Sequence, residues 1–348
     1  MQIGNKEISR DSIFIIAEVG SNHLGNLKLC QQMFKKAKEC GVDAVKLQKR
    51  SNKDMFMKSA YNAPYANEYS YGPTYGEHRE RLDWFGESEY REIIAMCKEL
   101  GIIFFATAFD FESADFLHNL DMPCYKIASC DAKNIPLIKY VAKKKKPMFI
   151  SLGGCDINDA QRIEEAIGAI NNQYALLHCL STYPNQDDEL QLGFIKTLAD
   201  EFSQHVIGFS THHPAVFPCL LAYMCGARIF EAHFTMNRAM GGTDHAFSFE
   251  THALEKLCED IRRVPLMVGD GYRRVLEKEV GRGSFIHKMG KAVHPARSLT
   301  IGHVIRKGDV VLKSPANGIP AFQLEDVFGK ELLADVSTSE ELTWDKLK

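Results

Sequence analysis

The segment VIGFSTHHPAVFPCLLAYMCGARIFEAHF (206–234) indicates the fold of this chain. Its two ends, VIGFST (206–211) and RIFEAHF (228–234), are short apolar runs rich in β-branched and aromatic residues, which is typical of buried strands. Because the text between them is helix-like, the segment predicts two parallel strands joined by a helix.

Six earlier runs of the same kind are FIIAEV (14–19), AVKLQ (44–48), IIFFATA (102–108), CYKIAS (124–129), MFISLG (148–153) and YALLHC (174–179). Amphipathic stretches separate them, and some end in a glycine such as Gly41 or Gly101, which is a helix-stop signal. Eight such units predict a closed (β/α)₈ TIM barrel of the α/β class rather than an open doubly wound sheet. No GxGxxG follows the first strand, which argues against a dinucleotide-binding fold.

Two segments depart from this alternation of strands and helices. Residues 50 to about 88 form a long stretch rich in Tyr, Asn and Gly, and at the carboxyl end of a barrel such a loop predicts a substrate lid. After a predicted helix at 251–269, the last part of the chain has short strand-like runs, a KGD turn and one short helix (Gln323 to Phe328), which indicates a small β-rich domain. We therefore expect a catalytic barrel at 1–280, a linker at 281–291 and a β-rich domain at 292–348 that packs on the barrel or on a partner chain.

Composition excludes several classes of protein. The 348 residues include 42 basic and 45 acidic side chains, well mixed, with a net charge of -3, so we expect neither a nucleic-acid surface nor a polybasic membrane patch. The chain lacks an apolar run of about 18 residues, and its start, MQIGNKEISRDS, does not resemble a secretory signal. The ten cysteines are scattered without a CxxC pair, so we expect reduced thiols in a cytoplasmic protein.

Two histidines stand where functional residues of a barrel are expected, at the carboxyl ends of strands. His212 follows one of the last two strands, and His233 ends the other, two residues after Glu231. One such histidine is more often a core or capping residue, but two on neighbouring strands favour a divalent transition metal. We interpret His178 and His213 as supporting or structural residues.

Charged residues also occur in the strand-like runs. Lys46 and Lys126 come from different strands and could converge on one anion, such as a phosphate or carboxylate. A Schiff-base role is the alternative, because burial lowers the pKa of a lysine. Glu18 ends the first strand, where a carboxylate is costly unless it is paired or used, so the choice there is between a structural ion pair and a functional role.

Several spaced motifs resemble the sialic acid (N-acetylneuraminate) synthase family. In order along the chain they are AEVGSNHLGN, VDAVKLQ, YKIAS, LLHC-x-x-x-YP, IGFSTH, and EAHFT followed by GTDHAFSFE. The later motifs IRKGD, PANGIP and LEDVFGK resemble the C-terminal antifreeze-like (SAF) domain of that family, so the similarity covers nearly the whole chain.

The resemblance implies a transferase that condenses phosphoenolpyruvate with an open-chain N-acyl-hexosamine, such as N-acetylmannosamine. The product would be a nine-carbon α-keto acid for surface polysaccharides, with release of phosphate. The resemblance also implies a homodimer in which each SAF domain reaches over the barrel mouth of the partner.

Matching positions imply a role for each residue. Phosphoenolpyruvate would be held by Lys46, Thr107, Lys126, Ser129, Ser181 and Ser210, with Ser181 standing where the family usually has Asn. The sugar would face Glu18, Gln48, Tyr183 and Asp244. His212 and His233 would bind Mn²⁺, or else Mg²⁺ or Co²⁺. The expected catalytic residues are Glu18, Lys46, Lys126, Glu231 and His233.

The acceptor stays open because the sequence departs from the family pattern. Ser314 stands where the family often has an arginine that contacts the sugar of the partner. The lid text YGPTYGEHRERL resembles synthases that take a 6-phosphorylated sugar, so His78, Arg79 and Arg81 either bind a phosphate or begin a solvated helix. Two further hypotheses are a metal-dependent sugar aldolase or hydrolase, and a binding protein without catalytic activity. Paired lysines disfavour the hydrolase, which has no need of them.

Overall fold

The computed structural model describes residues 1–348 and divides them into two compact units, Met1–Val268 and Gly269–Lys348. The last helix of the first unit, α11 (Thr251–Val268), matches the helix predicted at 251–269. The first unit ends with this helix, whereas the sequence pattern placed the end of the barrel domain at residue 280. None of the helices has both the length and the apolar composition needed to span a bilayer.

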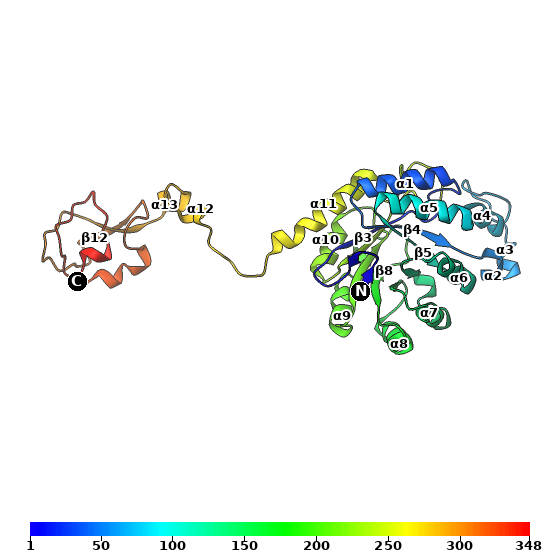
Figure 1. Cartoon of the computed structure of the whole chain (residues 1–348). Helices are drawn as coiled ribbons and strands as arrows, with labels where there is room; N and C mark the ends of the chain where they lie inside the picture. Colours follow the sequence, from blue (N-terminus) through cyan, green and yellow to red (C-terminus); the bar gives the residue numbers. More distant parts are fainter. The chain divides into compact units, whose positions relative to one another are not determined.

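The first unit is a closed ring of parallel strands, which confirms the predicted TIM barrel (Figure 1). In ring order the strands are β3 (Phe14–Glu18), β4 (Ala44–Lys49), β5 (Ile103–Ala108), β6 (Tyr125–Ile127), β7 (Met148–Ser151), β8 (Tyr174–Cys179), β9 (Val206–Thr211) and β10 (Ile229–His233). Strand β10 pairs with β3 and closes the ring, with His233 opposite Glu18.

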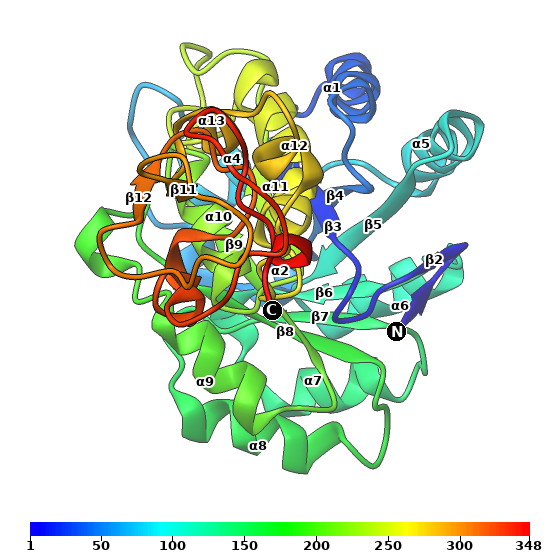
Figure 2. The same cartoon turned by 90° about the vertical axis from the view of Figure 1, so that its left-hand side faces the viewer.

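Helices cover the outside of this ring, as Figures 1 and 2 show. Besides α11 they are α1 (Leu27–Glu39), α5 (Glu87–Leu100), α6 (Phe111–Asn119), α7 (Ile135–Ala142), α8 (Ile157–Ile167), α9 (Gly193–Glu201) and α10 (Phe217–Met224). Helix α1 illustrates why they form: Asn26 caps its first turn, and Cys30, Met33, Phe34 and Ala37 make one buried stripe at helical spacing. The apolar stripes pack on the outer faces of the strands.

Along each strand, side chains alternate between the helices and the barrel interior. In β3, Ile15 and Ala17 belong to the core beneath the helices, whereas Phe14 and Ile16 belong to a separate apolar cluster inside the ring. This inner cluster also contains Phe105, Phe149, Leu177 and Ile229, together with Ile3 and Ile8 from the N-terminal segment with β1 (Gln2–Ile3) and β2 (Lys6–Glu7). The amino-terminal half of the barrel is therefore filled, and only the carboxyl half has room for a site.

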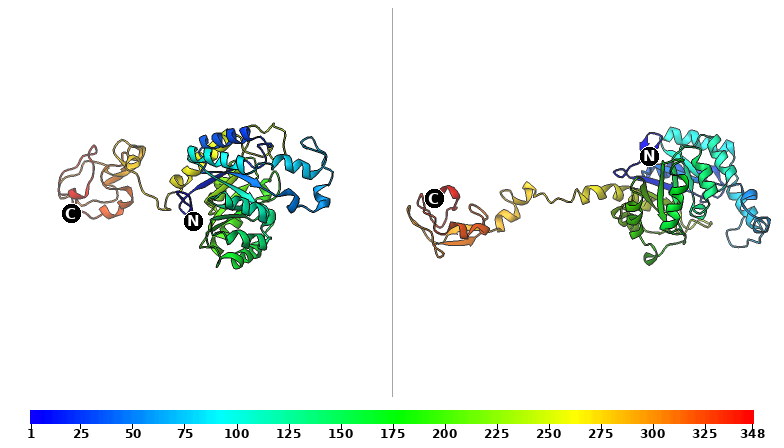
Figure 3. Two further views of the ribbon diagram at one scale, coloured as in Figure 1. Left: turned by 45° about the vertical axis from the view of Figure 1, so that its right-hand side comes forward. Right: turned by 90° about the horizontal axis from the view of Figure 1, so that it is seen from below.

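The lid segment (residues 50–88) contains three short helices, α2 (Asn52–Met55), α3 (Lys58–Tyr61) and α4 (Tyr75–Leu82), which project from one end of the barrel (Figures 1 and 3). Helix α4 begins with a capping box between Thr74 and Glu77. The ring of Tyr65 packs edge-on against Tyr75 and lies 4.7 Å from that of His78, measured between centroids. These contacts order a segment whose sequence has no regular period.

The second unit has its own small core. Strands β11 (Ala292–Pro295) and β12 (Val310–Lys313) pair antiparallel, and two short helices, α12 (Glu277–Val280) and α13 (Phe285–Met289), precede them. Its core residues are Val293, Leu299, Ile305, Val310, Ile319, Val327, Leu332, Val336, Leu342 and Leu347. The helix predicted from Gln323 to Phe328 is instead two 3₁₀ turns, Ala321–Gln323 and Glu325–Val327.

Candidate active site

A cavity of 510 Å³ lies at the carboxyl ends of the barrel strands. It is lined by every residue that the sequence pattern and the family resemblance assign to donor, sugar, metal or catalysis, namely Glu18, Lys46, Gln48, Thr107, Lys126, Ser129, Ser181, Tyr183, Ser210, His212, Glu231, His233 and Asp244. The lid segment contributes further lining residues, including Tyr65, Tyr75 and Arg79. The strand ends and the lid thus surround one site.

Four buried charges form the floor of this cavity. Nζ of Lys46 lies 2.6 Å from Glu18 and 3.5 Å from Glu231, and Nζ of Lys126 lies 2.7 Å from Glu231. Burial opposes the charge on Lys46, but the two carboxylates outweigh burial and raise its pKa. The lysines likewise outweigh burial and lower the pKa of Glu231. Lysines and carboxylates are equal in number, so the floor has no net charge.

Hydroxyl groups surround the two lysines. Nζ of Lys46 donates to Oγ1 of Thr107 at 2.9 Å, and the backbone N–H of Gly153 donates to Oγ of Ser129 at 3.0 Å. Ser151, at the end of β7, lines the same space, and its buried Oγ has no hydrogen-bond partner. An unpaired buried hydroxyl is costly unless a ligand pairs with it, which suits a site for an oxygen-rich anion.

Gly153 lies directly over these hydroxyls. A Cβ atom at this position would lie 2.3 Å from Oγ of Ser181 and 2.6 Å from Oγ of Ser129. Only glycine therefore lets the loop after β7 pass so close to both serines.

The two predicted metal ligands lie side by side. The rings of His212 and His233 are 5.4 Å apart between centroids. Nδ1 of His212 bonds the carbonyl of Leu180 at 2.6 Å, which leaves Nε2 as the free nitrogen, and burial, followed by His233, lowers the pKa of His212 to about 3. Nδ1 of His233 is buried without a hydrogen-bond partner, 3.8 Å from Oδ2 of Asp244.

This donor set fits a divalent ion with only two protein ligands. Both imidazoles offer a nitrogen that no hydrogen bond occupies, and a neutral imidazole is the form that binds metal. No three His, Cys, Asp or Glu side chains are grouped so that they alone could hold an ion. Water or substrate oxygens would have to complete the coordination.

The residues assigned to the sugar occupy one side of the cavity. Tyr183 packs on His212, with ring centroids 4.1 Å apart, and its side chain is 55% exposed. Gln48 donates to Oε1 of Glu18 at 2.7 Å and accepts from Arg50. Asp244 lies in the loop after β10 and accepts from Thr243. A ligand here would meet donors and acceptors from both the strands and the lid.

Other residues lie outside the cavity or were not foreseen. His178 bonds the carbonyl of Leu190, and His213 pairs with Asp187, which agrees with supporting roles. Arg81 is exposed and does not line the cavity, unlike His78 and Arg79. Ser151 and Arg50 also line the cavity, although neither was predicted as a site residue. Ser151 lies in the predicted run 148–153 and ends β7, so the rule that identified Lys46 could have found it.

The fold and the site define a class of protein: a TIM-barrel enzyme whose polar cavity brings lysines, carboxylates and two histidines together at the strand ends. Residues 33–273 match the model of the NeuB family, and residues 290–348 match that of the SAF domain. The chain belongs to the NeuB family, the family of the sialic acid synthases.

Individual relatives agree with this membership. The chain is 32% identical to N-acetylneuraminate-9-phosphate synthase of Homo sapiens over 93% of its own length and 89% of the relative. It is 31% identical to N,N'-diacetyllegionaminic acid synthase of Legionella pneumophila, over 96% and 94%. It also resembles the crystal structure of the spore coat polysaccharide biosynthesis protein SpsE of Bacillus subtilis, with a TM-score of 0.67, 28% identity, and coverage of 100% and 99%.

Proposed function

We propose that this protein condenses phosphoenolpyruvate with the open-chain form of an N-acyl-hexosamine and releases phosphate. The observation that carries the proposal is the floor of the cavity, where Lys46 and Lys126 lie among hydroxyls and the unpaired Oγ of Ser151. An aldolase or hydrolase that uses a neutral sugar alone has no need of such an anion site. Three relatives of this chain are named as synthases of nine-carbon acids or their phosphates, which supports the same reaction.

In this proposal the donor lies on the floor. Lys46, Lys126, Thr107 and the serines at 129, 151, 181 and 210 would surround its phosphate and carboxylate. The lysines are already paired with Glu18 and Glu231, so they would act as fixed electrostatic partners and not as Schiff-base nucleophiles.

The acceptor would lie toward the lid, between Gln48, Tyr183 and Asp244. His212 and His233 would hold a divalent ion, Mn²⁺ being our proposal, with Mg²⁺ and Co²⁺ as alternatives. When bound, this ion supplies a Lewis acid that makes the sugar aldehyde more electrophilic.

The reaction forms one carbon–carbon bond. C3 of the enol attacks the aldehyde carbon, whose oxygen gains a proton, and positive charge develops at C2 of the donor. Water then adds at C2. The bond between C2 and the bridging oxygen of the phosphate group breaks, which leaves the α-keto acid and free phosphate. Glu231 stays ionised beside its two lysines, and its negative charge would stabilise the positive charge at C2.

We also propose that the active form is a homodimer in which each SAF domain covers the barrel of the partner. The proposal rests on the family resemblance, and Tyr272, Phe285 and Phe322 of the second unit, which are 79%, 78% and 86% exposed, are apolar side chains that a partner could cover. Analytical ultracentrifugation at assay concentration checks this, and a fully active monomer would contradict it.

The reaction itself is tested by following phosphate release. We expect release only when phosphoenolpyruvate and an N-acyl-hexosamine are both present, together with loss of activity in EDTA and recovery on adding Mn²⁺. Mass spectrometry should show a product three carbons longer than the acceptor. Release without a sugar, or full activity in EDTA, would argue against the proposal.

A further inference from the structure

The loop that carries Asp244 (residues 235–248, the Asp244 loop) begins and ends beside the last residue of β10. The residues on either side of it, Phe234 and Phe249, form a parallel bridge, and the backbone N–H of Phe249 donates to the carbonyl of His233 at 2.7 Å. Asp244 itself lines the cavity, with Oδ2 3.8 Å from Nδ1 of His233. The ends of the loop are therefore fixed, whereas the position of Asp244 depends on contacts made by the loop itself.

A relay of two buried side chains holds the backbone of Asp244. Oγ of Ser248 donates to the carbonyl of Asp244 at 2.5 Å, and Nδ2 of Asn22 donates to Oγ of Ser248 at 2.9 Å. The same amide group of Asn22 also donates to the carbonyl of Phe234 at 2.9 Å, where the loop begins. Asn22 thus fixes the loop at its start and, through Ser248, at Asp244.

The burial of this relay indicates that it has a role beyond packing. Asn22 is 1% exposed and Ser248 is 0% exposed, so neither side chain can replace its partner with water. A buried polar group costs free energy unless it is hydrogen-bonded, and apolar side chains of similar size would fill the same space without needing partners. What the polar pair adds is a defined orientation of the loop that carries Asp244.

A second buried contact holds the residues on either side of Asp244. His245 is 0% exposed, and its Nδ1 lies 2.7 Å from Oγ1 of Thr235. Gly242 passes directly over the imidazole, because a Cβ atom at that position would lie 2.7 Å from Cδ2 of His245. The backbone around Asp244 is therefore packed in place, while its side chain stays 22% exposed and faces the cavity.

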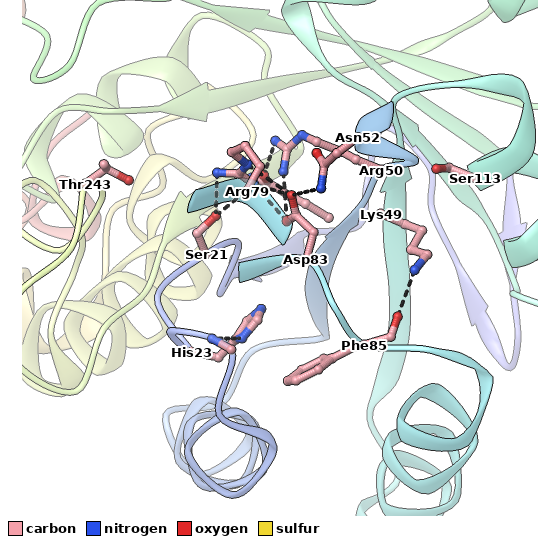
Figure 4. A network of polar contacts seen from close by, with 12 residues as sticks. Ser21, His23, Lys49, Arg50, Asn52, Arg79, Asp83, Phe85, Ser113 and Thr243 are labelled. Carbon is pink, nitrogen blue, oxygen red and sulfur yellow. Dashed lines mark hydrogen bonds and ion pairs between the residues drawn. The ribbon is translucent and has the colours of Figure 1, made fainter. Parts of the chain in front are cut away.

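Asn22 belongs to a loop that contacts two parts of the cavity wall. Its neighbours in the chain contact the lid segment: Oγ of Ser21 lies 3.5 Å from Nη1 of Arg79, and the ring of His23 stacks on Phe85 with centroids 4.6 Å apart (Figure 4). Asn22, between them, bonds the loop after β10 instead. Three consecutive residues after β3 therefore fix the lid segment and that loop relative to each other.

We propose that Asn22, acting through Ser248, positions the carboxylate of Asp244 toward the acceptor. The inference rests on the condensation proposed above, in which Asp244 faces the sugar. It adds two positioning residues that do not touch the substrates, since neither Asn22 nor Ser248 lines the cavity. Without the relay, the carbonyl of Asp244 loses its hydrogen bond and the carboxylate can turn away from the sugar. The effect should therefore fall on the acceptor and spare the donor.

The test is a double-mutant cycle with Ser248→Ala and Asp244→Ala. Its readout is kcat/KM for N-acetylmannosamine, or for its 6-phosphate if only that sugar is turned over. We expect Ser248→Ala alone to lower this value on the order of 10-fold and to leave the KM for phosphoenolpyruvate within about 2-fold of the wild type. In the Asp244→Ala background the same substitution should have almost no further effect, because the side chain that it positions is absent. Losses that multiply in the double variant would overturn the inference.

Asn22→Ala should lower kcat/KM for the acceptor at least as much as Ser248→Ala, because it removes the bond to Phe234 as well. Ser113→Ala is the matched control. Ser113, labelled in Figure 4, is also 1% exposed, and its Oγ donates to Asp110 at 2.9 Å, but it lies outside the cavity. A comparable acceptor-specific loss in Ser113→Ala would contradict a positioning role for Ser248.

Hydrogen exchange followed by mass spectrometry gives a reading that does not depend on turnover. The backbone N–H groups of the Asp244 loop should exchange faster in Ser248→Ala than in the wild type or in Ser113→Ala. Unchanged exchange would overturn the inference whatever the activity. If neither sugar is turned over by the wild type, the condensation fails, whereas faster exchange confined to the Asp244 loop would still support the relay.

Discussion

Lys126 and Glu231 meet across the interior of the barrel, with both carboxylate oxygens of Glu231 within 2.7 Å of Nζ of Lys126. Their strands, β6 and β10, are not neighbours in the ring. The pair therefore ties opposite walls of the barrel together at the level where the apolar filling ends. It also keeps Glu231 ionised and oriented beneath the cavity.

Lys126→Met should destabilise the barrel by about 3 kcal/mol, because it leaves Glu231 buried with only the more distant Lys46. Adding Glu231→Leu should recover most of the stability but no activity. Urea denaturation followed by circular dichroism measures both effects. A double variant as unstable as Lys126→Met would show that lost packing, and not the unpaired charge, causes the damage.

Gly153→Ala should weaken donor binding, because the added methyl group displaces the hydroxyls of Ser129 and Ser181. We expect the KM for phosphoenolpyruvate to rise by roughly 10-fold, with a smaller change for the acceptor. Steady-state kinetics with each substrate varied in turn checks this. Gly193→Ala is the control, since no atom lies within 4 Å of its added methyl group. Equal effects on both substrates would contradict a donor-specific role.

His233→Ala should abolish Mn²⁺ binding, because it removes one of the only two protein ligands that we propose for the ion. His213→Ala should not, although His213 is adjacent to His212, because it pairs with Asp187 outside the cavity. Electron paramagnetic resonance of added Mn²⁺ reports the free and bound ion directly. Undiminished binding in the His233→Ala variant would exclude this histidine as a ligand.

His23 should make the barrel less stable in mild acid. Burial lowers its pKa to about 4, and its Nδ1 accepts a hydrogen bond from the N–H of Gly25. The unfolded chain binds this proton at a pKa of about 6.5, so stability falls as the pH decreases from about 6.5 to 4. Lowering the pH from about 7.5 to about 5 should cost about 2 kcal/mol through this group.

The variant His23→Asn can still accept the Gly25 bond but does not titrate, so its unfolding free energy should depend less on pH. His252→Asn, which replaces an exposed histidine of α11, is the control. Urea denaturation at both pH values compares the three proteins. Identical pH dependence in the wild type and His23→Asn would refute the prediction.

Much of the barrel and its floor could be predicted because one periodic rule governs both. Interior positions recur at every second residue of a strand, so Lys46 and Gln48, or Glu231 and His233, had to share a face. Each predicted apolar run overlaps an observed strand. The pairing of Lys126 with Glu231 could not be predicted, because it joins residues 105 positions apart through closure of the ring.

The side-chain contacts of the lid could not be predicted from sequence patterns. Arg50 lies two residues past Gln48 in the alternation of its strand, but its pairing with Asp83 joins residues 33 positions apart through irregular text, and no strand or helix period predicts that pairing. Arg79 and Arg81 look alike in sequence, yet one lines the cavity and the other is exposed. Tertiary contacts of the lid determine which arginine faces the cavity. Arg79, for example, is held by hydrogen bonds from its Nε and Nη2 to the carboxylate of Asp83.

Because apolar side chains fill the amino-terminal half of the barrel, the cavity is closed at its base and open only at the carboxyl end. Phe14, Phe105 and Phe149 block its base, so everything must enter and leave past the lid. Five residues proposed for the donor are almost fully buried, namely Lys46, Thr107, Lys126, Ser151 and Ser210, whereas Tyr183 near the proposed acceptor is half exposed. If the donor binds at the base as proposed, it would have to enter before the sugar, and the phosphate formed there would have to leave past the lid.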